Sequence, residues 1–514
     1  MAVDSADYIF LLFFFFFFFF LFSTLIFFIF RSSKKKPARS PPSPPALPIL
    51  GHFHLLSSAL PKSLEALARR YGPLMQISIG SSRFLVASDA ATAQQILRTH
   101  DVKFASKFVF ASSHHNIFKE AEFVNAPYGA YWKFMKRLCM TKLFAGPQLN
   151  RFSHIREDET MKLLRSLWKC HRLGEPCDLS TKLTVLTNNM LCRMAMSKRC
   201  SGSDHQAQEI REIVRDTMVC AARLSFAEVH GPLKRVDLFG NGKRLRTALR
   251  RFDALIEQII KEYEDDCGEA SEEKDVMDIL LETYRDPNAE TRLTRDQIKH
   301  FFLDLLIAGV DTTSASMQWA ITELLKHPHM LKKLREEIDS AVGSTRLVHE
   351  SDVPNLPYLR AVVKETLRLH TPGPLLRRKC NSNCEINGYD VKVGTNILIN
   401  AYAIMHDPGT WEDPDEFVPE RFMAGDGHGD GHHMELKGQD FHFLPFGSGR
   451  RSCIGVAHAT IVMHTAIGGL IQCFDLEGGD KVDIKVVTGY SGTMANPLVC
   501  YPIGRLNPTV LHVK

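Results

Sequence analysis

The chain has 514 residues, of which 45% are apolar and 24% are charged, and its formal net charge is +5 at pH 7. The apolar content is typical of a globular protein with a deep core, and the small excess of positive charge gives no indication of nucleic-acid binding. Its twelve cysteines include no C-x-x-C pair, so the sequence indicates neither a disulfide framework nor a zinc site and fits a reducing compartment.

The N-terminal segment is strongly apolar. Tyr8–Phe30 contains eight consecutive phenylalanines, and as a helix it would reach roughly 35 Å, enough to cross a bilayer. Arg31 and further basic residues follow directly, which by the positive-inside rule places the rest of the chain in the cytosol. We therefore predict that residues 1–30 form an uncleaved, single-pass membrane anchor, with a cleaved signal peptide as the alternative.

A basic and proline-rich segment, residues 31–62, comes next. The density of prolines in Pro41–Pro48 favours a stiff, extended conformation, so we predict a hinge that sets the angle between the anchor and the rest of the chain. A disordered spacer is the alternative. Because there is no second linker or change of composition after Lys62, residues 63–514 are predicted to form one large domain.

The predicted secondary structure of this domain is mainly α-helical with small β-sheets. Leu74–Ile79 and Arg83–Ala87 predict a short hairpin, and strand-like segments return at Cys384–Tyr389, at Thr395–Asn400 and near the C-terminus. Most of the chain between residues 88 and 376 predicts helices.

One of these helices is unusually long. Thr294 and Gln297 have the T-x-x-Q form of a capping box, and apolar residues continue to Leu325 before Pro328 ends the pattern. The pattern predicts a helix of about thirty residues, roughly 45 Å long, which is enough to cross the domain.

A polar motif, Ala308–Thr313, lies in the middle of this helix. A threonine hydroxyl here can bond the carbonyl of Ala308 and bend the helix, and Gly309 lacks the side chain that would fill the resulting notch. The notch could admit dioxygen, with Asp311 and Thr312 as a proton-delivery pair. A purely structural kink is the alternative.

The loop Phe446–Gly455 is the most informative part of the chain. Gly449 and Gly455 allow backbone angles and close approaches that a side chain would forbid. The apolar run from Ile454 to about Phe474 predicts a helix with Cys453 at its N-terminus. A thiolate at Cys453 would therefore be stabilised by the N–H groups and the dipole of the helix N-terminus. Such a sulfur is suited to bind iron, and Arg451 could reach an anionic group beside it. A buried structural cysteine is the alternative.

The pattern F-x-x-G-x-R-x-C-x-G is matched at every fixed position of this loop and resembles the haem-binding signature of the cytochrome P450 family. The motif A-G-x-D-T-T resembles the oxygen-activation motif of that family, and the proline-rich segment resembles the hinge of its microsomal members. Tyr128–Trp132 and Pro445–Arg451 are similar to plant members, in particular to the group that oxidises isoflavonoids, strigolactones and pentacyclic triterpenoids.

The resemblance implies a cytochrome P450 fold and haem b with the Cys453 thiolate as its axial iron ligand. The further cofactor-binding residues that it implies are Trp132, Lys136, Arg378, Phe446, Arg451 and Gly455. The family usually has arginine at the position of Lys136, and Arg137 could take over its contact with a haem propionate. Arg377 is the rival of Arg378 for a second propionate contact.

The resemblance also implies roles for two further groups of residues. Glu365 and Arg368 lie three residues apart in a predicted helix and can pair, although most such pairs are exposed and weak. Their E-x-x-R spacing resembles the buried ion pair below the haem, with Arg421 as its third member. In the oxygen-activation motif the resemblance implies Asp311 as the acid and Thr312 as the alcohol.

The activity that the resemblance implies is that of an NADPH- and O2-dependent monooxygenase in the endoplasmic reticulum membrane. The sequence has no flavin or nicotinamide fingerprint, so electrons must come from outside the chain. The resemblance implies an NADPH-dependent cytochrome reductase as their source, with Lys133, Lys136 and Arg450 as candidate docking residues. The substrate would be a lipophilic small molecule. By resemblance its pocket is lined by Phe108–Phe123, Phe301–Gly309, Gly373–Leu376 and Ser491–Asn496.

Among plant specialised metabolites we favour a triterpenoid, oxidised through several steps to a carboxylic acid, over a flavonoid or isoflavonoid. A haem-thiolate isomerase or dehydratase that needs no reductase is an alternative class, and a non-catalytic haem or lipid carrier is another. The Asp311-Thr312 pair argues against the isomerase, because that chemistry needs no proton delivery to dioxygen.

Overall fold

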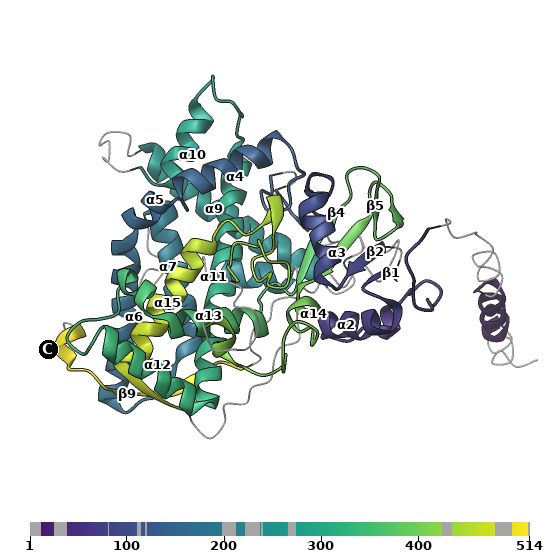
Figure 1. Ribbon diagram of the computed structural model, residues 1–514. Coiled ribbons are helices and arrows are strands. Elements are labelled where there is room, and N and C mark those ends of the chain that lie inside the picture. Colours follow the sequence, from purple (N-terminus) through teal and green to yellow (C-terminus); the bar gives the residue numbers. More distant parts are fainter. Residues whose placement is uncertain are drawn as a thin grey trace, which may run out of the picture.

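The computed structural model describes residues 12–24, 39–80, 82–109, 115–118, 121–197, 212–220, 237, 240–265, 274–423, 434–478 and 496–511. In these parts the protein has a large helical body with small sheets beside it (Figure 1), which confirms the predicted fold class. The helices are α2 (Leu60–Tyr71), α3 (Ala90–Gln94), α4 (Ala130–Lys142), α5 (Gly146–Arg151), α6 (Ser153–Leu173), α7 (Leu179–Met196), α9 (Asn241–Asp265), α10 (Val276–Arg285), α11 (Arg295–Lys326), α12 (Pro328–Ala341), α13 (Pro357–Leu369), α14 (Ala401–Met405) and α15 (Val456–Cys473). The strands are β1 (Leu74–Ile79), β2 (Ser82–Ala87), β3 (Cys177–Asp178), β4 (Leu375–Lys379), β5 (Cys384–Ile386), β6 (Tyr389–Val391), β7 (Asn396–Asn400), β8 (Phe474–Gly478) and β9 (Val499–Gly504).

The largest described sheet has four strands in the order β1-β2-β7-β4. β1 and β2 form the predicted antiparallel hairpin, β7 lies parallel to β2, and β4 returns antiparallel beside β7. The prediction of one strand-like segment at Cys384–Tyr389 is wrong in part, because the chain turns back within it. Asn387 and Gly388 have positive φ values of 51° and 79° and connect β5 to β6, which is the conformation that two-residue hairpin turns require.

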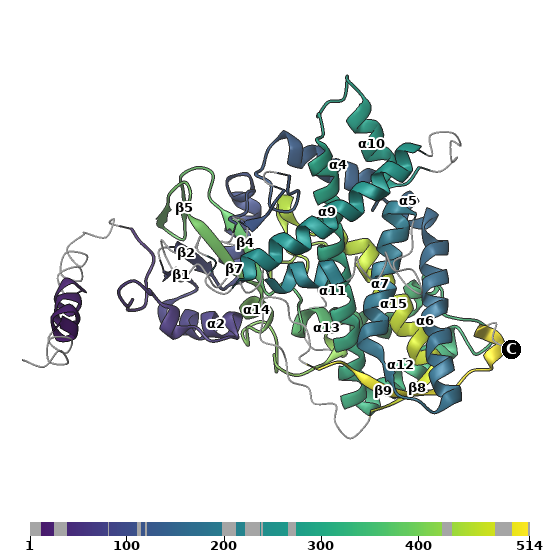
Figure 2. The same ribbon diagram turned by 180° about the vertical axis from the view of Figure 1, so that it is seen from behind.

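Helix α11 crosses the middle of the helical body in both ribbon views (Figures 1 and 2). The predicted capping box is confirmed: the Gln297 N–H donates to the Thr294 hydroxyl at 3.2 Å, and the Thr294 N–H donates to the Gln297 side chain at 2.9 Å. The helix has 32 residues, and α7, α13 and α15 pack against it. It is therefore the element that connects the polar motif to the packing of the helical core, which includes the helix that follows Cys453.

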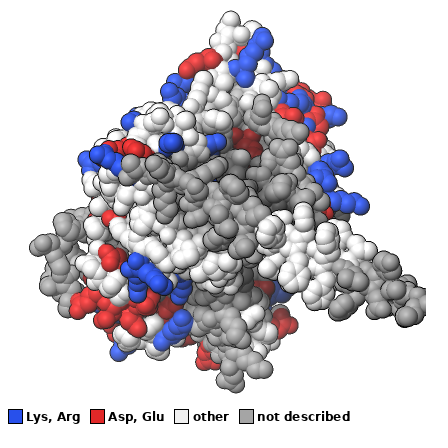
Figure 3. Space-filling view, turned by 90° about the vertical axis from the view of Figure 1, so that its right-hand side faces the viewer, with Lys and Arg blue, Asp and Glu red and all other residues white. Residues whose placement is uncertain are grey.

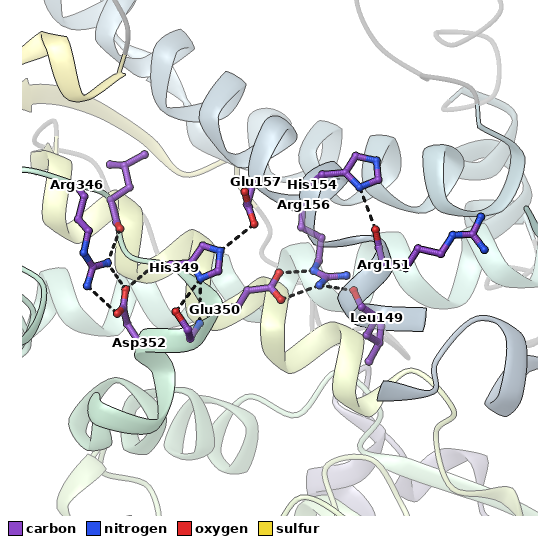
Figure 4. A network of polar contacts seen from close by, with 11 residues as sticks. Leu149, Arg151, His154, Arg156, Glu157, Arg346, His349, Glu350 and Asp352 are labelled. Carbon is purple, nitrogen blue, oxygen red and sulfur yellow. Dashed lines mark hydrogen bonds and ion pairs between the residues drawn. The ribbon is translucent and has the colours of Figure 1, made fainter. Parts of the chain in front are cut away.

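A polar network fastens the connection between α12 and α13 to α6 (Figure 4). The buried Arg156 donates to both carboxylate oxygens of Glu350, at 2.6 and 2.7 Å, and to the Leu149 carbonyl at 2.7 Å. Nearby, the His349 ring lies 2.9 Å from the carboxylate of Glu157. Because α6 also packs against α15, this network supports the helix that follows the cysteine loop.

The described part of the predicted anchor, Leu12–Thr24, is an apolar helix outside the helical body (Figure 1). The side chains of Phe13–Phe20 are between 48% and 71% exposed. This helix is shorter than the roughly 20 residues that span a bilayer, and the remainder of residues 1–30 lies outside the described residues. α15 is long and apolar enough to cross a membrane, but it is mostly buried in the protein core.

Candidate active site

Cys453 lies in the loop between a short 3-10 helix, Gly449–Arg451, and α15. Its backbone N–H donates to the carbonyl of Phe446 at 2.9 Å, which closes the loop. α15 begins at Val456 with Gly455 as its N-cap, two residues later than predicted. The cysteine is exposed by surface area, yet the atoms packed around its thiol desolvate it and raise its pKa. Together these properties indicate that the thiol faces an enclosed space inside the protein.

The direction of this pKa shift differs from the predicted stabilisation of a thiolate. Desolvation is the largest effect and disfavours the anion, whereas the Gly455 N–H and the charges of Lys107 and Lys136 act in the opposite direction. A metal cation reverses this balance, because a thiol that coordinates a metal is deprotonated. The helix N-terminus alone is therefore not enough to keep Cys453 ionised.

Two glycines of the loop differ in how strictly their surroundings require glycine. Gly449 has a φ of 73°, and a Cβ atom there would lie 2.5 Å from the Leu97 carbonyl oxygen, so only glycine fits. Gly455 has an ordinary φ of −92°, but a Cβ atom on it would lie 3.9 Å from the Cys453 sulfur. That distance is an ordinary van der Waals contact, so packing in the described structure does not require glycine at this position.

Three cations, Lys107, Arg378 and Arg451, form a basic cluster beside the cysteine loop. The guanidinium of Arg451 lies 4.2 Å from the centre of the Trp132 ring and donates to backbone carbonyls, including that of Ala126. Lys107 was not predicted as a site residue. Its position as a lysine inside an apolar stretch is the sequence feature that could have indicated a role for Lys107 in the site.

Among the described residues, the carboxylates of Asp101 and Asp304 act on the basic cluster only from a distance. Burial lowers the pKa of Arg378 to about 10 and that of Arg451 to about 9, and burial followed by the charge of Arg377 lowers the pKa of Lys107. In the described parts of the chain, no carboxylate forms an ion pair with these three cations. Because buried cations without a partner are costly, the cluster fits an anionic group such as the carboxylates of a haem.

Lys136 and Arg137 on α4 are the alternative candidates for one propionate contact, and the structure distinguishes between them. Lys136 lies 5.3 Å from the centre of the Trp132 ring and donates to the Arg450 carbonyl, so it points toward the cysteine loop. Arg137 pairs instead with Glu290 at the exposed surface. Of these two residues, Lys136 is the one placed to contact a cofactor.

Arg377 and Arg378 on β4, the rival candidates for a second propionate contact, also point in different directions. Arg378 is 3% exposed and donates to the Ser448 carbonyl in the cysteine loop at 3.3 Å. Arg377 donates to the Phe108 carbonyl and to the Asn125 side chain, both at 3.1 Å. Arg378 therefore belongs to the basic cluster, and Arg377 holds the segment between β2 and α4.

On α11, the hydroxyl of Thr312 donates to the Ala308 carbonyl at 2.7 Å, as predicted. Burial raises the pKa of Asp311, which favours the protonated acid. The interpretation of Gly309 needs correction. A Cβ atom there would lie 2.5 Å from Leu191 on α7, so this glycine permits close packing of α11 on α7 and does not open a notch toward Thr312.

The predicted ion pair between Glu365 and Arg368 is fully buried and bidentate, with both hydrogen bonds at 2.7 Å. Arg421 approaches the same carboxylate at 3.5 Å and donates to the Asp413 carbonyl at 2.8 Å. Arg368 also donates to three backbone carbonyls, those of Met405, Pro414 and Glu416. The triad therefore holds the segment between α14 and the cysteine loop against α13.

Comparison with known proteins gives consistent matches. The profile of the family described as Cytochrome P450 matches residues 41–497. The chain is 39% identical to 3,9-dihydroxypterocarpan 6A-monooxygenase of Glycine max over 91% of this chain and 94% of that protein, and 39% identical to its Beta-amyrin 24-hydroxylase over 91% and 93%. A solved zebra fish cytochrome P450 with progesterone has a TM-score of 0.74 at 26% identity, covering 87% of this chain and 99% of that chain.

Proposed function

The chain belongs to the cytochrome P450 family and is a haem-thiolate monooxygenase, and on this premise we propose that it hydroxylates a hydrophobic plant specialised metabolite. The observation that carries the proposal is the accessible Cys453 sulfur beside a basic cluster that forms no ion pair with a carboxylate among the described residues. We favour a triterpenoid, oxidised through to a carboxylic acid, and the β-amyrin hydroxylase among the relatives supports it. The pterocarpan monooxygenase, equally similar, supports a flavonoid or isoflavonoid as the second candidate.

The proposed cofactor is haem b. Cys453 would hold its iron, Gly455 would leave room for its face, and Lys107, Arg378, Arg451 and Lys136 would hold its propionates, with Trp132 and Phe446 around it. When bound, haem supplies the activation of dioxygen that permits hydroxylation of an unactivated C–H bond. The protein supplies the thiolate, the electrostatic complement of the propionates and a site from which bulk water is excluded.

Proton delivery is proposed for Asp311 and Thr312. Burial keeps the Asp311 carboxyl ready to hold a proton, and the Thr312 hydroxyl, anchored on the Ala308 carbonyl, can pass one on. We expect Thr312→Ala to lower the yield of product per NADPH consumed about tenfold, below the roughly 10²–10⁴-fold effect of a positioned acid–base group, because Asp311 remains. Thr312→Ser is the control. Equal yields in Thr312→Ala and the wild type would contradict this role.

The assignment of Lys136 to a propionate leads to a second expected result. Lys136→Ala should speed haem loss to apomyoglobin about fivefold, the effect of one lost contact of ~1 kcal/mol. Lys136→Arg should retain haem at least as well as the wild type, because its fork can bind a carboxylate with two hydrogen bonds. Arg137→Ala is the matched control, since Arg137 pairs with an exposed carboxylate. If haem is lost faster from Arg137→Ala than from Lys136→Ala, the propionate contact belongs to Arg137 and not to Lys136.

Electrons come from a separate redox partner, and we propose that this partner is NADPH-cytochrome reductase. Lys133, Lys136 and Arg450 present positive charge near the cysteine loop, although Arg450 is partly neutralised by Asp101 at 2.7 Å. Such a face attracts an acidic partner surface, and this electrostatic attraction should weaken at high salt. Steady-state turnover rates with the reductase, measured at two ionic strengths, test this docking face.

We propose residues 1–30 as the anchor in the endoplasmic reticulum membrane, 31–62 as the hinge and 63–514 as the cytosolic catalytic domain. Four apolar side chains in and just after the proline-rich segment are exposed, between 41% and 57%: Leu47, Ile49, Leu50 and Phe53. On the side of the N-terminal helix, the described Lys, Arg, Asp and Glu side chains lie mainly toward the edges of the view (Figure 3). The four exposed apolar side chains support a surface that faces the bilayer. Carbonate extraction of microsomes tests the membrane anchor. Protease protection of microsomes tests the cytosolic position of the catalytic domain.

The test of the function is expression with a plant reductase, feeding of a panel of triterpenoids and flavonoids, and analysis of products. Oxygenated products that require both NADPH and dioxygen are expected. Turnover without either would favour the isomerase or dehydratase class, and failure on every lipophile despite normal thiolate ligation would favour a carrier. Of the four segments predicted to line the pocket, residues 110–114, 119–120 and 491–495 lie outside the described residues.

A further inference from the structure

The outer side of the cysteine loop rests on a short 3-10 helix, Asp101–Phe104. Both carboxylate oxygens of Asp101 accept the backbone N–H of Arg450, each at 3.2 Å. Arg450 belongs to the 3-10 helix Gly449–Arg451, whose own N-cap residue, Ser448, supplies no side-chain hydrogen bond to it. A carboxylate from a distant part of the chain therefore caps the turn that leads to the Cys453 sulfur.

The backbone of this turn lies directly against the carboxylate. A Cβ atom on Gly449 would lie 2.8 Å from the Asp101 Oδ1 atom, which is too short for a side chain. Glycine thus lets the turn approach Asp101 closely enough for the Arg450 N–H to be bound. The strict need for glycine at this position and the location of Asp101 have the same cause.

Asp101 also pairs with the side chain of Arg450. The guanidinium donates to Asp101 through Nη1 at 2.7 Å and to the Tyr128 hydroxyl through Nε at 2.9 Å. The carbonyl of Arg450 accepts from the ammonium of Lys136. The N–H, the carbonyl and the side chain of Arg450 are all engaged, so this residue cannot shift without breaking several hydrogen bonds at once.

The 3-10 helix that carries Asp101 is itself anchored in the core. Phe104, its last residue, is 1% exposed. The carbonyl of Ala105, the next residue along the chain, accepts from the guanidinium of Arg451. Two consecutive arginines of the cysteine loop, Arg450 and Arg451, are therefore held at the two ends of one short helix, and Asp101 provides the charged contact.

The pair of Asp101 and Arg450 lies at the boundary between the site and the surface. The side chain of Asp101 is 13% exposed and that of Arg450 is 43% exposed. Lys133, whose ammonium lies 4.9 Å from the centre of the Tyr128 ring, adds further positive charge beside this pair. Because a carboxylate faces Arg450, the charge that this face offers to an acidic partner is smaller than the sequence indicates.

We propose that Asp101 is a positioning residue that holds the cysteine loop for iron ligation and at the same time withholds the charge of Arg450 from the redox partner. This inference rests on the proposed function, since it assumes that Cys453 binds the iron of haem and that electrons come from a separate protein. Asp101 acts through Arg450, three residues before the sulfur, and takes no part in the chemistry itself.

The first test follows the full-length holoenzyme, reduced and bound to carbon monoxide, in a low concentration of urea. In Asp101→Leu the red-shifted Soret band should be lost at least about tenfold faster than in the wild type, because the Arg450 N–H loses both acceptor atoms. Asp101→Asn keeps an oxygen for that N–H and should stay within about threefold of the wild type. Asp178→Leu is the matched control. Asp178 caps α7 by accepting the Thr181 N–H at 3.0 Å, and its loss should change the rate less than about threefold.

The second test uses purified NADPH-cytochrome reductase at low ionic strength. Asp101→Asn releases the guanidinium of Arg450, so the reductase concentration that gives half-maximal turnover should fall at least about twofold. This gain should shrink at high salt and disappear in the double variant Asp101→Asn/Arg450→Met, which lacks the released charge. A gain that persists in the double variant would contradict the assignment to Arg450.

The two tests also separate this inference from the proposed function. A wild type without the red-shifted band would refute the proposed function itself. Where the wild type has that band, equal rates of band loss in Asp101→Leu and the wild type, or no rescue by Asp101→Asn, would overturn the role of Asp101 in the loop. If Asp101→Leu does not load haem, the reductase titration of Asp101→Asn decides, and an unchanged half-maximal concentration would overturn the proposal.

Discussion

Replacement of Cys453 by serine is expected to abolish the red-shifted Soret band of the reduced protein with carbon monoxide. Turnover should fall at least about 10²-fold, equivalent to ~2.7 kcal/mol in activation free energy. Serine has nearly the same size, so the loop and its hydrogen bond to Phe446 should survive. The substitution removes the thiolate, which donates electron density to iron and favours O–O cleavage in a way that a hydroxyl cannot.

The control for this substitution is Cys384→Ser, which changes a partly exposed cysteine on β5. It should leave the spectrum and the turnover unchanged, since no part of the site involves it. Haem content must be measured in parallel, because the basic cluster can still bind propionates after the sulfur is removed. A Cys453→Ser protein with full haem content, the same spectrum as the wild type and normal turnover would refute the assignment of the axial ligand.

Features that depend on neighbouring residues were predictable from the sequence. The capping box at Thr294 and the bond from Thr312 to Ala308 each involve residues three or four apart, so a helical pattern suffices to place them. The pairing of Glu365 with Arg368 followed from the same spacing, and its complete burial was implied by the family resemblance alone.

Features that depend on tertiary packing were not predictable. Gly309 was assigned to a notch on α11, but the neighbour that requires it, Leu191, is more than a hundred residues away. The thiol pKa of Cys453 was predicted from the helix N-terminus, whereas desolvation by the whole surrounding structure sets its direction. Likewise, nothing in the sequence around Lys107 identifies the arginines that meet it in space. Local patterns thus indicate which side chains carry chemistry, and packing decides their environment.

The ion triad below the cysteine loop provides the prediction with the largest expected effect on assembly. Glu365→Ala would leave Arg368, which is completely buried, and Arg421, whose side chain is 13% exposed, without the carboxylate between them. Removal of one partner of a buried pair costs about 3–5 kcal/mol, because the remaining charge can neither be solvated nor paired. This is a large part of the roughly 5–15 kcal/mol by which a folded protein is stable.

We therefore expect Glu365→Ala to yield little haem-loaded protein, measured as the red-shifted absorbance per unit of purified chain. The effect should be larger than that of Glu365→Gln, which keeps the shape of the side chain and an acceptor for one guanidinium. Glu336→Ala is the matched control, because Glu336 is 66% exposed and its contact with Lys332, at 3.8 Å, should be worth less than ~1 kcal/mol. A normally assembled Glu365→Ala holoprotein would mean that the carbonyl contacts of Arg368 hold this segment without the carboxylate, and that the triad is not what fastens the cysteine loop to α13.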